Sequence, residues 1–130
     1  MSVIQMEHDV DPRKTLLKQL GKLDDIEIFN NQLLCAVYIR PEKTKGGIVL
    51  PDQHRNEDKF QGKVGLVLKK GSKAFVDDTN TWFDGVDVNI HDWIVYRPSD
   101  GWSITVNGVL CRILDDISIR GRIQHPDQVW

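Results

Sequence analysis

The chain has 130 residues, the size of one domain, and a formal net charge of −2, which argues against a protein that binds nucleic acid through its phosphates. No apolar run approaches the roughly 20 residues of a membrane span, and the N-terminus lacks the basic and apolar regions of a signal peptide. The composition, 40% hydrophobic and 28% charged, is that of an ordinary soluble globular protein, for which we expect a cytoplasmic location.

The first predicted element is a short α-helix over Pro12–Leu20. Asp11 suits the N-cap, proline suits the first helical position, and Gly21 is a natural C-terminal stop. The three leucines of this segment share one side of the helix, and a helix this short is not stable unless they pack on something. That surface could belong to this domain or to a neighbouring subunit or protein, and the sequence favours neither.

The rest of the chain predicts short β-strands separated by turns, and therefore an all-β barrel or sandwich. Residues 32–39 are nearly all apolar, as in a strand that is buried on both faces. Residues 63–68 form a second strand. Residues 86–90 alternate between apolar and polar, as in a half-buried strand.

The C-terminal third contains the strongest hairpin signal. Asn107-Gly108 lies between two apolar runs, at residues 104–106 and 109–111, which predicts a tight turn between antiparallel strands. Residues 117–119 predict the last strand, and residues 124–130 are expected to be a tail.

An apolar tripeptide lies between the first two predicted strands. Gly46 and Gly47 precede Ile48, Val49 and Leu50, and a proline and a strongly polar run follow. Glycine loses the most backbone freedom on ordering, so the pair predicts a hinge at the start of a flexible loop that presents the three apolar side chains. The alternative is an ordinary strand over residues 47–50 that packs into the core.

The segment from Gly46 to Pro51, followed by the polar run and by Gln61-Gly62-Lys63-Val64-Gly65, resembles the mobile loop of the co-chaperonin (GroES-like) family. Three further stretches resemble the family's strands, and one resembles its Asp-Gly-aromatic turn: residues 33–40, 86–96 and 109–119, and Asp100-Gly101-Trp102. The resemblance spans about residues 30–123, between an extension over residues 1–29 and the tail. It implies a small irregular β-barrel with a mobile loop and a roof hairpin over residues 69–85.

The resemblance also implies a function. In this family a homo-oligomeric ring, usually a heptamer, caps a GroEL-like chaperonin, and the loop binds the chaperonin's apical domains. Ile48, Val49 and Leu50 would be the chaperonin-binding residues, and Gly46 and Gly47 the hinge. ATP would be bound by the chaperonin, so we expect no cofactor in this chain, no nucleic acid and no membrane.

No enzymatic motif is present in the sequence. The four histidines lack the spacing of metal ligands, and no phosphate-binding loop or nucleophile elbow occurs, so we expect neither catalysis nor a bound metal. Cys35 and Cys111 lie in strand-like apolar runs and are expected to be buried free thiols, with a disulfide as the minor alternative.

Several departures from the family pattern suggest a divergent member, for instance one encoded by a phage. His91 replaces a typical glycine, the usual Arg-Pro-Leu-x-Asp-Arg opening is missing, and the extension over residues 1–29 is unusual. The alternative function is therefore a virion structural or decoration protein, in which the loop clamps a capsid protein and the extension is an inter-subunit arm. For a ring, we expect residues 32–39 of one protomer to pair with residues 117–123 of the next.

Overall fold

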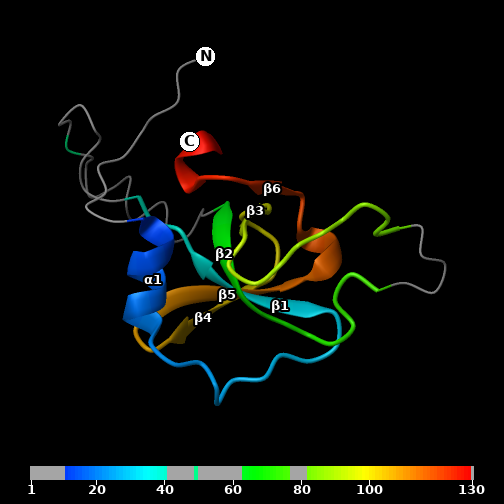
Figure 1. Cartoon of the computed structure of the whole chain (residues 1–130), viewed down its shortest axis with the longest axis horizontal. Helices are drawn as coiled ribbons and strands as arrows, with labels where there is room; N and C mark the ends of the chain where they lie inside the picture. Colours follow the sequence, from blue (N-terminus) through cyan, green and yellow to red (C-terminus); the bar gives the residue numbers. More distant parts are fainter. Residues whose placement is uncertain (1–10, 41–48, 50–62, 77–81, 130) are drawn as a thin grey trace.

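The computed structural model describes residues 11–40, 49, 63–76 and 82–129. Within them a six-stranded antiparallel sheet has the order β4-β5-β1-β2-β3-β6, with a single α-helix, α1, beside it (Figure 1). The elements are α1 (Pro12–Leu20), β1 (Gln32–Val37), β2 (Val64–Lys70), β3 (Trp93–Val95), β4 (Trp102–Val106), β5 (Val109–Asp115), η1 (Asp116–Ser118), β6 (Gly121–Ile123) and η2 (Pro126–Val129), where η denotes a 3₁₀ helix. The predicted all-β class with one short helix is confirmed.

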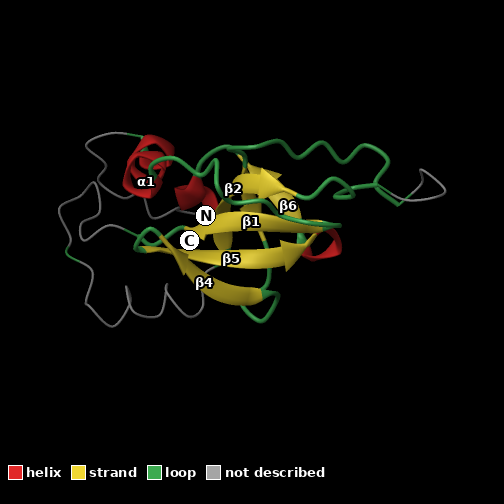
Figure 2. Cartoon of the chain, turned by 90° about the horizontal axis from the view of Figure 1, so that it is seen from below, coloured by secondary structure: helices red, strands yellow, loops and turns green. Residues whose placement is uncertain are grey.

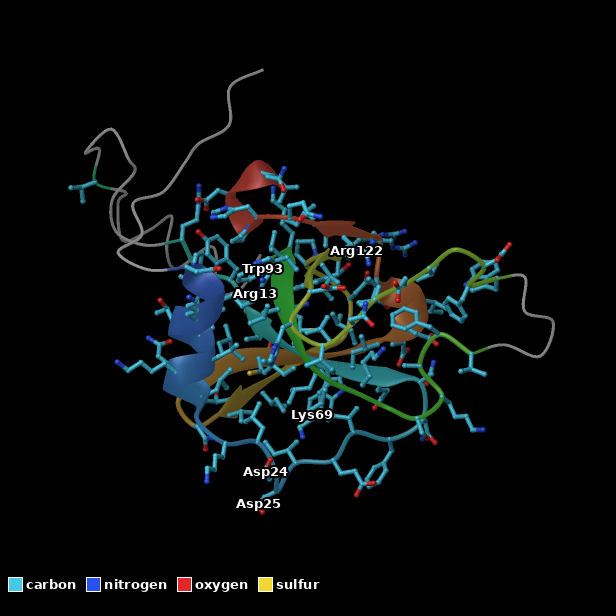
Figure 3. All side chains as sticks on the ribbon, in the orientation of Figure 1. Arg13, Asp24, Asp25, Lys69, Trp93 and Arg122 are labelled. Atoms are coloured by element: carbon cyan, nitrogen blue, oxygen red, sulfur yellow. The ribbon has the colours of Figure 1, made fainter. Side chains whose placement is uncertain are left out.

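Strand β1 is central and, as predicted, is buried on both faces. Its side chains alternate between two apolar clusters, with Leu34 and Ala36 in one and Leu33 and Cys35 in the other. Figure 2 shows β1, β5 and β4 side by side in one layer. Trp93 of β3 is a large, fully buried side chain of the core, and it lies well inside the molecule, whereas Asp24 and Asp25 lie at the periphery (Figure 3).

The predicted hairpin is confirmed. Asn107 and Gly108 have φ angles of 50° and 82°, so both central residues are in the left-handed region that a type I′ turn requires. Val106 and Val109 are paired on either side of the turn. This turn was predictable because its conformation depends on the two residues themselves.

Helix α1 has the predicted bounds and packs on its own domain. The Asp11 carboxylate accepts a hydrogen bond from the Arg13 N–H at 2.9 Å, and Gly21 is the C-cap. Leu20 is 1% exposed and belongs to the core. The side-chain amide of Asn107 also donates to the Leu20 carbonyl oxygen at 2.6 Å, which fixes the helix end to the β4–β5 turn. The helix therefore packs on its own domain, which was one of the two possibilities that the sequence left open.

The predicted strand over residues 86–90 is wrong. Val86 and Ile90 are 44% and 42% exposed, and only Val88 is buried. The backbone donors of this segment are used in turns, since the Val86 N–H bonds to the Phe83 carbonyl and the Asn89 N–H to the Asp92 carboxylate. The segment therefore has no ladder partner, and the strand begins only at Trp93.

The predicted strand over residues 117–119 is also wrong, because Asp116 diverts the chain into η1. The Asp116 carboxylate accepts hydrogen bonds from the Asn31 side chain at 3.2 Å and from the Phe75 N–H at 3.0 Å. Its own N–H donates to the Asn31 carbonyl oxygen at 2.9 Å. These hydrogen bonds hold residues 116–118 in a 3₁₀ turn, so β5 does not continue past Asp115. The last strand is β6, Gly121–Ile123.

The expected pairing of residues 32–39 with a neighbouring protomer is wrong for β1. Both of its edges are already paired, one with β2 and the other with β5. The edge strands of the described sheet are β4 and β6.

Residues 77–81 of the predicted roof hairpin lie outside the described residues. On either side of them, residues 71–76 and 82–85 form turns without strands. Phe75 and Phe83 pack edge to face, with ring centroids 5.5 Å apart. The described residues on the two sides of the 77–81 gap are therefore in contact.

Candidate functional site

Of the predicted binding and hinge residues, only Val49 is described by the structure. Its side chain is 53% exposed. Gly46, Gly47, Ile48 and Leu50 lie outside the described residues. The site can therefore be built from the described residues at the two ends of the 41–62 segment, here called the loop base.

The two ends of the 41–62 segment leave the sheet side by side. Val37 at the end of β1 pairs with Gly65 of β2, and the next N–H, that of Tyr38, donates to the Val64 carbonyl oxygen at 2.9 Å. The Tyr96 N–H donates to the Lys63 carbonyl oxygen at 3.0 Å. Backbone hydrogen bonds therefore hold the loop base as far as Tyr38 on one side of the segment and Lys63 on the other.

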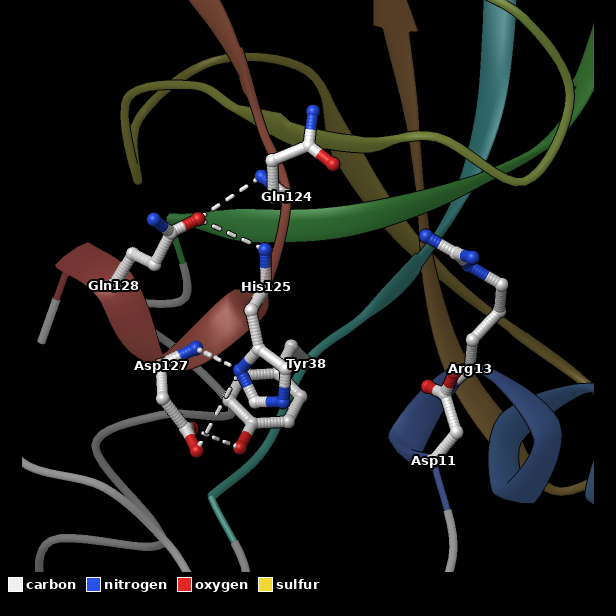
Figure 4. Close-up of polar contacts among 7 residues, drawn as sticks. All are labelled: Asp11, Arg13, Tyr38, Gln124, His125, Asp127 and Gln128. Atoms are coloured by element: carbon white, nitrogen blue, oxygen red, sulfur yellow. Dashed lines mark hydrogen bonds and ion pairs between the residues drawn. The ribbon is translucent and has the colours of Figure 1, made fainter.

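Tyr38 anchors the loop base in the core. Its ring packs edge to face on Trp93, with centroids 5.7 Å apart and an interplanar angle of 77°. Its hydroxyl donates to Oδ1 of Asp127 at 2.5 Å, the short end of the range for O–H···O hydrogen bonds (Figure 4). Both residues are buried, so the contact joins the end of β1 to the C-terminal segment without competition from water.

The C-terminal segment that carries Asp127 has its own internal hydrogen bonds (Figure 4). Oε1 of Gln128 accepts from the backbone N–H groups of Gln124 and His125, both at 2.9 Å. The Asp127 N–H donates to Nδ1 of His125 at 3.2 Å. Because Nδ1 is an acceptor there, its approach to Oδ2 of Asp127 at 3.7 Å is not a hydrogen bond. Residues 124–129, expected only as a tail, thus form a folded segment on the core.

The predicted Asp-Gly-aromatic turn lies between β3 and β4. Nη1 of Arg112 donates to the carbonyl oxygens of Pro98 and Asp100 at 2.6 and 2.5 Å. Gly101 has a φ of 69°, and a Cβ at this position would lie 2.2 Å from the carbonyl oxygen of Ile113. Glycine is therefore required here both by the backbone conformation and by the close approach of β5.

The two cysteines are buried free thiols, as predicted. They lie on neighbouring strands but in different apolar clusters, Cys35 in one and Cys111 in the other, so their side chains are on opposite faces of the sheet. Burial raises the pKa of Cys111 to about 11 and raises the pKa of Cys35 well above its ordinary value. Thiols with raised pKa values are poor nucleophiles at neutral pH.

In the part of the chain that the structure describes, no group of three or more His, Cys, Asp or Glu side chains is arranged to hold a metal ion. Nor does any helix among the described residues have the length and apolar character needed to cross a membrane. The Tyr38–Asp127 contact could not be predicted, because Asp127 lies in a polar segment whose sequence carries no signal of burial.

No curated protein matches the chain. The sequence profile of the family described as "Chaperonin 10 Kd subunit" matches residues 25–123, which include the entire 41–62 segment and end on the last residue of β6. The match covers well over half of the chain, and it agrees with the all-β fold and with the predicted resemblance. The chain therefore belongs to the chaperonin 10 kDa family, that is, to the co-chaperonins.

Proposed function

We propose that the protein is a co-chaperonin that docks on a GroEL-like chaperonin through Ile48, Val49 and Leu50 and caps its cylinder while the chaperonin hydrolyses ATP. The observation that carries this proposal is the family match, which runs through the whole 41–62 segment. The exposure of Val49 adds to it, because an apolar side chain in water is available to a partner. In this function the chain is a binding protein and not an enzyme.

The proposed binding is weak for one loop and strong for several. Each large aliphatic side chain contributes at most about 1.5–3 kcal/mol on burial. Ordering the loop backbone costs about 1–2 kcal/mol for each residue that becomes fixed. Several loops on one ring raise the apparent affinity through their effective concentration, while each contact stays weak enough to release. We therefore propose a mobile loop with Gly46 and Gly47 as its hinge, on a cyclic, heptameric ring.

The packing of α1 on its own domain supports this proposal over the virion alternative. That alternative uses the N-terminal extension as an arm on a neighbouring subunit, whereas Leu20 and the Asn107 contact commit the helix to this chain. In a ring, β4 and β6 are the strand edges that the described sheet leaves for head-to-tail contacts.

The test of the proposed function is a double substitution, Val49→Ser with Leu50→Ser. We expect it to abolish ATP-dependent binding to a bacterial chaperonin, measured by pull-down, and to leave the circular dichroism spectrum unchanged. Ile117→Ser is a matched control, because its aliphatic side chain is as exposed as that of Val49, at 56% against 53%, and it is not part of the tripeptide. A double variant that unfolds, or that binds as well as the control, would refute the assignment.

Proteolysis tests the proposed mobility of the loop. We expect trypsin to cut first after Lys45, Arg55 or Lys59, and saturating chaperonin to slow that cleavage. Cleavage at equal rates throughout the chain would contradict a mobile loop. Native mass spectrometry of the free protein should show a discrete ring, and a stable monomer that ignores chaperonin would favour the virion alternative.

A further inference from the structure

We propose that residues 124–129 are a clasp that fixes the loop base, with Tyr38 and Asp127 as its positioning residues. This proposal rests on the proposed function, because the loop base matters for docking only if the 41–62 segment binds a partner. The family match ends at Ile123, so the clasp lies outside the part of the chain that the match covers.

The clasp is attached at the point where the sheet ends and the 41–62 segment begins. In the described part of the chain, the hydrogen bond from the Tyr38 N–H to the Val64 carbonyl oxygen joins the ends of β1 and β2 closest to the 41–62 segment. The same residue donates its hydroxyl to Asp127 and packs its ring on Trp93. The backbone and side chain of one residue therefore connect the loop base to the C-terminal segment.

Asp127 is buried beside Tyr38, and the segment around it is closed by its own hydrogen bonds. Its side chain is 5% exposed, and Pro126 beside it is fully buried. The Gln128 side chain closes the turn around residues 124 and 125, and Val129 packs on the same apolar cluster as Tyr38 and Trp93. A buried carboxyl group that loses a hydrogen-bond donor is left short of a partner and destabilises its surroundings. Loss of the Tyr38 hydroxyl should therefore loosen both the clasp and the loop base.

A fixed loop base has a functional consequence. When several loops of one ring bind together, the gain in affinity depends on whether each tripeptide can reach its binding site on the chaperonin. A loop base with a fixed position makes that distance the same for every loop. If Tyr38 is free to leave the sheet, more residues must be ordered on docking, and each adds an entropic cost. The clasp shortens the segment that must be ordered.

Amide hydrogen exchange of the complete protein tests the clasp without any partner. In Tyr38→Phe, which keeps the ring on Trp93, we expect the amides of residues 38 and 96 to exchange about fivefold faster or more, as for the loss of one hydrogen bond. The Asp116 amide, which is bonded to Asn31 at the opposite end of β1, should not change. Asp127→Ala should give the same pattern, and the double variant should be no worse than the worse single variant.

Asp116→Ala is the matched control, because it also removes a buried carboxyl group that holds β1, but at the other end of the strand. It should accelerate exchange at its own end and leave the amide of residue 38 unchanged. Unchanged exchange at residue 38 in Tyr38→Phe, or equal acceleration at both ends of β1, would overturn the clasp.

Chaperonin binding in the presence of ATP then tests the positioning role. We expect Tyr38→Phe to weaken binding severalfold more than Asp116→Ala does, when both are measured at a temperature at which each variant is folded. Faster exchange at residue 38 with unchanged affinity would overturn the positioning role. If the unmodified protein does not bind chaperonin at all, the proposed function fails, while the exchange experiment still decides whether the clasp exists.

Discussion

Replacing Leu20 by alanine tests whether α1 is part of the folded domain. Leu20 is 1% exposed and lies in the core cluster with Trp93 and Val106. Truncating a fully buried leucine removes its transfer free energy and leaves a cavity, which together cost about 2–5 kcal/mol. Since a domain of this kind is stable by only about 5–15 kcal/mol, the variant should lose a large part of its free energy of unfolding.

Urea denaturation followed by tryptophan fluorescence measures this loss. With a slope of about 1–3 kcal/mol per molar urea, a loss of about 3 kcal/mol shifts the midpoint by roughly 1–3 M. Lys18→Ala is the control on the same helix, because Lys18 is exposed and the two residues have similar helix propensities. Protein concentration must be the same for all variants, because oligomerisation changes the apparent stability.

The reasoning would be refuted if Leu20→Ala shifted the midpoint no more than Lys18→Ala. The same would follow if it changed only the mass of the assembly, because the helix would then act on a neighbouring subunit and not on its own core.

Three further predictions follow from the β-sheet and its turns. Gly101→Ala should destabilise the protein by at least about 2 kcal/mol in urea denaturation, and Gly108→Ala, where a Cβ meets nothing within 4 Å, by only about 1–2 kcal/mol from its positive φ. Arg112→Lys should cost about 1–3 kcal/mol in the same assay, because lysine keeps the charge but lacks the planar guanidinium that places Nη1 between the two carbonyl oxygens and lies 5.5 Å from the centre of the Tyr96 ring. Burial raises the pKa of the Cys111 thiol from 9.0 to about 11, so the unfolded chain releases this proton first and stability should fall as pH rises from 9 to 11. Urea midpoints measured across that range should fall less steeply in Cys111→Ala, and an identical slope would contradict the assignment.

Elements whose cause is local could be predicted from the sequence. The Asp11 cap, the following proline and Gly21 set the bounds of α1, and the structure has those bounds. Asn107-Gly108 specifies its turn because both residues tolerate positive φ. The interpretation of residues 48–50 as a binding segment depended on their flanking residues together with the resemblance to the family's loop, and it stays a prediction.

Other features depend on residues that are far apart in the sequence. Residues 86–90 have the alternation of a strand, but their backbone donors are bonded in turns, and only the tertiary structure decides which partner a donor finds. Asp116 ends β5 because Asn31 and Phe75 reach it from distant segments. The Tyr38–Asp127 bond joins residues 89 positions apart, one in an apolar strand and the other in a polar segment. A pattern along the chain reports which side chains prefer burial, whereas the partner that makes a buried polar group stable is supplied only by the fold.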